Sequence, residues 1–99
     1  MSVSQKFEIL QESFLDSSEF DQILDKLFDV VVSQYRNRLK RYERDLREFE
    51  KQYQIDSMKF YKRFEGGEMG DAMDFFEWAG LYELYQALQG KINQMETAA

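Results

Sequence analysis

Carboxylates and guanidinium groups are the chemically active side chains of this sequence, because it contains no histidine and no cysteine. The usual general base near neutral pH, the commonest metal ligand and the thiolate nucleophile are therefore missing. Five carboxylates follow one another closely, at Glu65, Glu68, Asp71, Asp74 and Glu77. Their spacing matches neither a calcium-binding loop nor a helical di-metal motif, which also needs histidines. We expect no enzyme, no metal and no cofactor, and we interpret these carboxylates as helix-capping groups.

Basic side chains gather in the middle of the chain, where a nucleic-acid contact could form. The cations are Arg36, Arg38, Lys40, Arg41, Arg44, Arg47 and Lys51. A dense row of cations can neutralise phosphates, but acidic residues are interleaved and the isoelectric point is near 4.6, unlike that of a typical DNA-reading domain. We expect these cations to be solvated or ion-paired, with nucleic-acid binding through them as the alternative function.

The net charge of −6 is distributed unevenly along the chain. Residues 1–29 carry two basic and seven acidic side chains, residues 30–64 carry ten and five, and residues 65–99 carry one and seven. Antiparallel helices with complementary flanking charges are favoured, so we expect the acidic ends to fold back beside the basic middle. The alternative is a basic strip that faces an external acidic partner.

A single long helix is predicted from residue 18 to about residue 54, with Ser18 and Asp21 as its capping pair. In its second half apolar residues recur at steps of 4, 3, 4, 3 and 4, at Tyr35, Leu39, Tyr42, Leu46, Phe49 and Tyr53. A 3.5-residue period predicts a coiled-coil seam, along which another helix must lie. The final helix, predicted over residues 71–95 with Asp71 and Asp74 at its start, is the natural partner.

Two shorter helices complete the prediction. Val3, Phe7, Leu10 and Phe14 indicate an amphipathic helix within residues 1–17, and Ser2 with Gln5 could form its capping box. We expect this helix to cover the core, and a detachable arm is the alternative. Residues 57–65 form the other helix, which Gly66 and Gly67 end. The predicted fold is all-α: a single domain, residues 1–99, built as a long antiparallel, coiled-coil-like hairpin with short additional helices.

Surface and location follow from the same patterns. The last helix is apolar on more than one face, which favours a homodimer. No apolar run approaches the ~20 residues of a membrane span, and the first ten residues do not resemble a signal peptide. We therefore expect no membrane partner and a cytoplasmic location.

One stretch carries a resemblance to a known kind of protein. The residues Arg63-Phe64-Glu65-Gly66-Gly67-Glu68-Met69-Gly70-Asp71 form a glycine turn, and the pair Glu77-Trp78 follows in the next helix. This pattern, over about residues 36–90, resembles small helical antitoxin-like proteins of prokaryotic two-gene toxin–antitoxin-like operons. The resemblance implies a partner similar to the TumE-type small toxin family, encoded nearby. Residues 1–30 lie outside the matching stretch.

From these observations we predict a non-catalytic, antitoxin-like interaction module that binds and neutralises a small basic partner protein. Carboxylates would steer such a partner and aromatic side chains would provide affinity. The candidate partner-binding residues are Glu68, Asp71, Phe76, Trp78, Tyr82, Glu83 and Tyr85. Trp78 has a competing interpretation, because a tryptophan in a helix stripe is more often part of the core.

Overall fold

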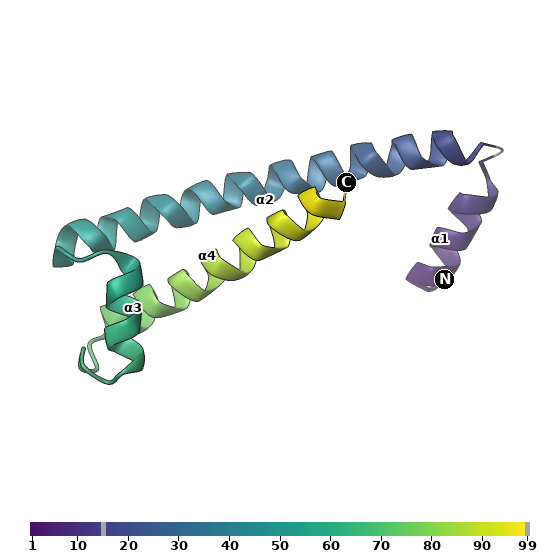
Figure 1. Cartoon of the computed structure of the whole chain (residues 1–99). Coiled ribbons are helices and arrows are strands. Elements are labelled where there is room, and N and C mark those ends of the chain that lie inside the picture. Colours follow the sequence, from purple (N-terminus) through teal and green to yellow (C-terminus); the bar gives the residue numbers. More distant parts are fainter. Residues whose placement is uncertain (15, 99) are drawn as a thin grey trace.

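The computed structural model describes residues 1–14 and 16–98, and in those residues the chain forms four α-helices (Figure 1). These are α1 (Val3–Glu12), α2 (Ser17–Tyr53), α3 (Ser57–Glu65) and α4 (Met73–Ala98). The long helices α2 and α4 run antiparallel, and α3 crosses the closed end of this hairpin. The molecule measures 60 × 24 × 18 Å. The predicted all-α hairpin with short additional helices is confirmed.

Helix α2 is continuous because no glycine or proline interrupts Ser17–Tyr53. The carboxylate of Asp16 caps it by accepting a hydrogen bond from the Ser18 backbone N–H at 2.9 Å, so the prediction of Ser18 as the cap is wrong. At the other end Gln54 takes the left-handed conformation, with φ 56°. Its side-chain amide donates to the Lys51 carbonyl at 2.7 Å, which offsets the cost of that conformation in a residue other than glycine.

The segment after α2 makes two sharp turns. Asp56 caps α3 by accepting from the Lys59 backbone N–H at 2.9 Å, and Gly67, with φ 74°, takes the left-handed conformation just past its end. Helix α4 begins at Met73 and continues to Ala98, so it starts later and ends later than predicted. Within residues 16–98 Asp71 makes no side-chain hydrogen bond to the start of α4. The predicted cap at Asp71 is therefore wrong.

The core lies along the predicted seam and is densest at the closed end of the hairpin. Leu39 and Leu46 of α2 and Ile92 of α4 are buried between the long helices. Phe60 of α3 and Trp78 of α4 are both 0% exposed. Their rings stack with centroids 3.7 Å apart and planes 2° apart. Burying two large aromatic side chains at one point ties α3 to the hairpin.

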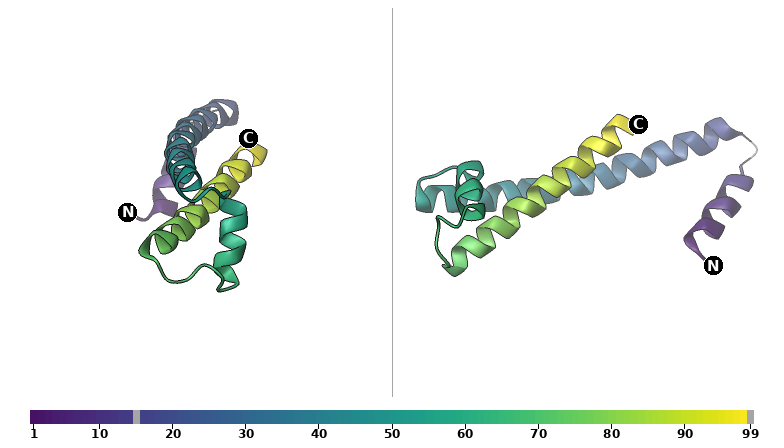
Figure 2. Two further views of the ribbon diagram at one scale, coloured as in Figure 1. Left: turned by 90° about the vertical axis from the view of Figure 1, so that its left-hand side faces the viewer. Right: turned by 60° about the horizontal axis from the view of Figure 1, so that its bottom comes forward.

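The N-terminal part of α2 extends past the end of α4 (Figure 2). Helix α1 turns away from it, and its ten described residues include none that is buried. Its contact with α2 is aromatic, with the Phe7 ring 5.7 Å from that of Phe20. The predicted capping box of Ser2 and Gln5 is present. The expectation that this helix covers the core is wrong, and α1 lies as an arm.

Only one of the two acidic ends of the chain lies beside the basic middle. Arg36 of α2 forms an ion pair with Glu96 of α4, so the acidic C-terminal stretch does lie beside the basic middle. The acidic N-terminal stretch does not, because α1 and the first turns of α2 lie at the far end of the molecule. The expectation that the acidic N-terminal stretch folds back beside the basic middle of the same chain is therefore wrong. No helix in the part of the chain that the structure describes has the length and apolar character to cross a membrane.

Candidate partner-binding groove

A buried hydrogen-bond network joins α2, α3 and α4 and fixes the shape of the closed end. The indole Nε1 of Trp78 donates to Ser57 Oγ at 2.9 Å. The Ser57 hydroxyl and backbone N–H in turn donate to Glu50 Oε2, at 2.7 and 2.8 Å. Each buried side-chain polar atom in residues 1–14 and 16–98 has a hydrogen-bond partner, so the network holds the three helices in a single arrangement.

The Glu50 carboxyl has an altered pKa for reasons visible in this network. Partial burial acts to raise the pKa, but the hydrogen bonds from Ser57 and from Arg47, together with the Arg47 charge, outweigh burial and lower the pKa below 4.5. The Arg47 guanidinium donates to Glu50 Oε1 at 2.8 Å. Glu50 is therefore ionised at neutral pH and accepts hydrogen bonds on both oxygens.

Two tyrosines connect α4 to its neighbours in the same way. The Tyr53 hydroxyl donates to Asp74 Oδ2 at 2.6 Å, and the Tyr61 hydroxyl donates to Glu83 Oε1 at 2.5 Å. The hydrogen bond to Asp74 raises the pKa of Tyr53. Hydrogen bonds to Glu83 and then Glu65 raise the pKa of Tyr61 well above its usual value. Both phenols therefore stay protonated at neutral pH, and their hydrogen bonds position α4.

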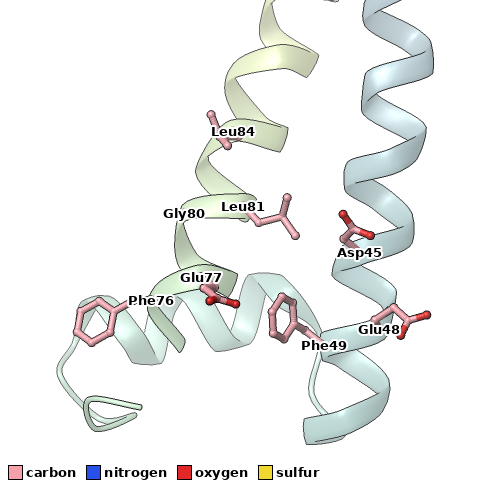
Figure 3. Close-up of a pocket in the computed structure, with 8 residues that line it drawn as sticks. All are labelled: Asp45, Glu48, Phe49, Phe76, Glu77, Gly80, Leu81 and Leu84. Atoms are coloured by element: carbon pink, nitrogen blue, oxygen red, sulfur yellow. The ribbon is translucent and has the colours of Figure 1, made fainter. Parts of the chain in front are cut away.

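An open, largely apolar groove of about 840 Å³ lies between α2 and α4 near this network (Figure 3). Phe49 of α2 and Leu81 of α4 point toward one another in its interior. Gly80 lines the groove without a side chain, and nothing lies within 4 Å of where its Cβ would be. Phe76 and Leu84 complete the lining from α4 and are 53% and 55% exposed. Large apolar side chains at this exposure are available to a partner.

The charged residues that line this groove are all acidic. Asp45 and Glu48 project from α2, and Glu77 projects from α4. An apolar groove with such a rim attracts a cationic group and accepts its hydrogen bonds, as charged interface rims do. No three carboxylates in residues 1–14 and 16–98 are grouped closely enough to hold a metal ion.

The seven candidate residues predicted from the sequence do not form one surface. Phe76 lines the groove, whereas Trp78 is in the core and therefore does not present its side chain to a partner. Tyr82 and Tyr85 are half-buried and line a different, smaller cavity beside Leu46. Glu83 is exposed and bound to Tyr61, and Glu68 and Asp71 are exposed in the segment before α4.

Sequence reasoning missed most of the groove. The lining residues it did not select are Asp45, Glu48, Phe49, Glu77, Gly80, Leu81 and Leu84. A signal was present in α4, because Phe76, Gly80 and Leu84 follow at steps of four and so share a face beside the main seam. The contribution of α2 could be located only once the register of the two helices was known.

The seven candidate nucleic-acid-binding cations are all exposed on α2. Arg36, Lys40, Arg44, Arg47 and Lys51 follow at steps of three or four and share one face. Two of these five are paired inside the chain, Arg36 with Glu96 and Arg47 with Glu50. Arg38 and Arg41 lie off this face, and the Arg38 guanidinium is 5.8 Å from the centroid of the Tyr35 ring.

A scan against protein-family models, a search of curated proteins and a search of solved structures each found no match.

Proposed function

We propose that this chain is a non-catalytic interaction module that holds a small basic partner protein in the groove between α2 and α4. One observation carries the proposal: the exposed apolar side chains of Phe76 and Leu84 border a groove whose charged lining residues are exclusively acidic. A basic segment with an apolar face fits such a site, because its apolar anchors are buried while its cations meet the rim. Its natural form is an amphipathic helix laid along the hairpin.

Antitoxin-like neutralisation is the most concrete form of this function. It is supported by the resemblance of the glycine turn, residues 63–71, and of the Glu77-Trp78 pair to antitoxin-like proteins. The groove is compatible with that role, since covering a cationic surface of a small toxin requires acidic groups for steering and apolar anchors for affinity. We place this activity in the cytoplasm, where such a partner would be made.

The test uses the small basic protein encoded beside this one, co-expressed with it. Leu84→Lys puts a cation into the groove at an exposed position, so the domain should keep its helicity and melting temperature. We expect binding of the neighbouring protein to weaken by roughly 10-fold or more, which is the usual cost at an interface anchor. Growth inhibition by the neighbour should be relieved by the wild-type chain and not by the variant.

Met58→Lys is the matched control, because Met58 of α3 is 57% exposed and lies outside the groove. It should bind the neighbour as the wild type does. Equal binding by the Leu84→Lys variant would place the partner elsewhere on the molecule. A neighbour that neither co-purifies nor loses toxicity in the presence of this chain would remove the proposal.

Nucleic-acid binding is the second candidate, and the exposed row of Arg36, Lys40, Arg44, Arg47 and Lys51 favours it. A mobility-shift titration at several salt concentrations separates the two functions. Phosphate contacts by such a row would produce an affinity that falls steeply with salt. Binding to DNA or RNA with that slope, together with no binding of the neighbouring protein, would move the assignment to this candidate.

A further inference from the structure

The N-terminal part of α2 carries an apolar face that the described chain leaves largely exposed. Phe20, Ile23, Leu27 and Val30 follow at steps of three, four and three, so they share one side of the helix. Ile23, Leu27 and Val30 are 48%, 57% and 54% exposed. The cavity between α2 and the last turns of α4 reaches along α2 only as far as Phe28. Ile23 and Leu27 therefore precede the part of α2 that packs against α4, and the N-terminal part of α2 extends past the end of α4 (Figure 2). An apolar stripe of this size marks an interaction surface.

Helix α1 enlarges this surface and does not close it. Its Phe7 ring packs against Phe20, at the first turns of α2. Ile9 and Leu10 of α1 are themselves about half exposed or more. The arm α1 and the first turns of α2 lie together at one end of the elongated molecule (Figure 1), and both leave apolar side chains exposed there.

The charges on α2 indicate what covers this face. Its start is acidic, with Asp16 and Glu19, and α1 adds Glu8 and Glu12. Further along the helix Arg38 and Arg41 are exposed, and neither forms an ion pair within the described residues. At 1.5 Å per residue Asp16 and Arg38 are about 33 Å apart on a continuous helix, so they cannot meet within one chain. They can meet between two copies whose helices run in opposite directions.

We propose that the N-terminal part of α2, residues 17–34, is the interface of a symmetric homodimer in which two copies of this helix pack antiparallel about Leu27. In this register Leu27 lies opposite Leu27 of the second copy, and Ile23 lies opposite Val31. Asp16 of each copy then lies opposite Arg38 of the other, with the acidic end of α1 near Arg41. A two-fold interface of this kind is self-complementary: each patch is used twice.

The arrangement differs from the proposed partner site in position and in chemistry. The dimer face is at the open end of the hairpin, and none of its residues lines the acidic groove. We assign a second copy of the chain to this face because Arg38 and Arg41, the cations that would pair with the acidic start of α2, lie on α2 itself. A basic partner protein would not satisfy Arg38 and Arg41.

The test is the mass in solution by sedimentation equilibrium at micromolar concentrations. The wild type should sediment at twice the chain mass of 11.9 kDa. Leu27→Asp and, separately, Leu27→Lys place like charges opposite each other, and each should weaken self-association by about a hundredfold or more. Both variants should keep wild-type helicity, because Leu27 is more than half exposed in the single chain. Met58→Asp, at an equally exposed position on α3, should remain dimeric.

Mixing the two variants tests the register. Since Leu27 faces its own copy, Leu27→Asp and Leu27→Lys chains should form a heterodimer although neither forms a homodimer. A wild type that stays monomeric at high micromolar concentration, or a Leu27→Asp variant that dimerises as the wild type does, would overturn the proposal. A mixture that stays monomeric would overturn the antiparallel register about Leu27.

Discussion

The carboxylate of Glu50 lies at the centre of the hydrogen-bond network that links α2, α3 and α4. Its two oxygens accept hydrogen bonds from Ser57 on one side and from Arg47 on the other, and Ser57 in turn accepts from the indole of Trp78. The charge of Glu50 thus contributes to a contact between three helices. A charged acceptor strengthens such hydrogen bonds relative to a neutral one.

The lowered pKa of Glu50 predicts how stability depends on pH. Because the folded pKa lies below the unfolded value of about 4.5, the stabilisation is fully present above that value. It is lost as the pH falls through the folded pKa, where the carboxylate becomes protonated. Glu50→Gln should reduce the free energy of unfolding by about 1 kcal/mol at pH 7, and this difference should shrink as the pH falls through the folded pKa, since the wild type then loses the charge too.

Urea denaturation at pH 7 and at a series of lower pH values measures this difference. Glu48→Gln is the matched control, because Glu48 is exposed on the same helix and accepts no side-chain hydrogen bond within residues 16–98. Its stability should follow the wild type at each pH. A difference between the Glu50→Gln variant and the wild type that does not shrink at any pH between 7 and the acid unfolding of the protein would contradict the role of the Glu50 charge.

Among the contacts between helices, the buried seam of α2 and α4 should contribute much more to the free energy of unfolding than the groove does. Leu46 is 2% exposed and packs in the same cluster as Phe60 and Trp78, whereas Leu84 of α4 is 55% exposed. Leu46→Ala should therefore reduce the free energy of unfolding by about 2–5 kcal/mol, through lost burial and a residual cavity. Leu84→Ala removes the same atoms and should change it by about 0.5 kcal/mol or less.

Equilibrium urea unfolding followed by circular dichroism, which reports helix content, measures both variants. Similar losses of stability for the two substitutions would mean that Leu84 is buried in solution. That result would leave the groove without its exposed anchor and would weaken the proposed function as well.

The sequence specified the helices well because their signals are local. The steps from Tyr35 to Tyr53 place one face of α2 against a second helix, and the structure buries Leu39 and Leu46 there. Helix ends were less accurate, since several polar residues compete for each cap: Asp16 replaces Ser18, and Asp74 accepts from Tyr53. The position of a cap is decided by a single hydrogen bond, whereas the buried face of a helix is decided by many apolar side chains.

The groove and the position of α1 were beyond local reasoning for a different reason. Glu48 and Glu77 are far apart in the sequence, and only the register of α2 against α4 makes them two sides of one rim. Likewise the apolar stripe of α1 predicts burial, but it does not say whether its own chain or another provides the contact. The structure leaves that stripe exposed, which is why the pattern led to the wrong expectation of a core helix.

The whole molecule is long rather than compact. Its radius of gyration is 19.6 Å, compared with about 13 Å for a compact domain of 100 residues. The core is confined to the hairpin, while the arm α1 and the first turns of α2 have few buried apolar contacts. Local stability follows such contacts, so it should decrease from the closed end of the hairpin toward the N-terminus.

The stacked position of Trp78 allows the decrease in local stability toward the N-terminus to be followed by tryptophan fluorescence. Trp78 is the single tryptophan of the chain, and its indole is sealed against Phe60 and Phe49 at the closed end. Its fluorescence therefore reports that junction alone, whereas circular dichroism sums every helix, α1 included. In a urea titration of dilute monomer the ellipticity should begin to fall at lower urea than the emission changes. Superimposable curves would show that the arm and the junction melt as one cooperative unit.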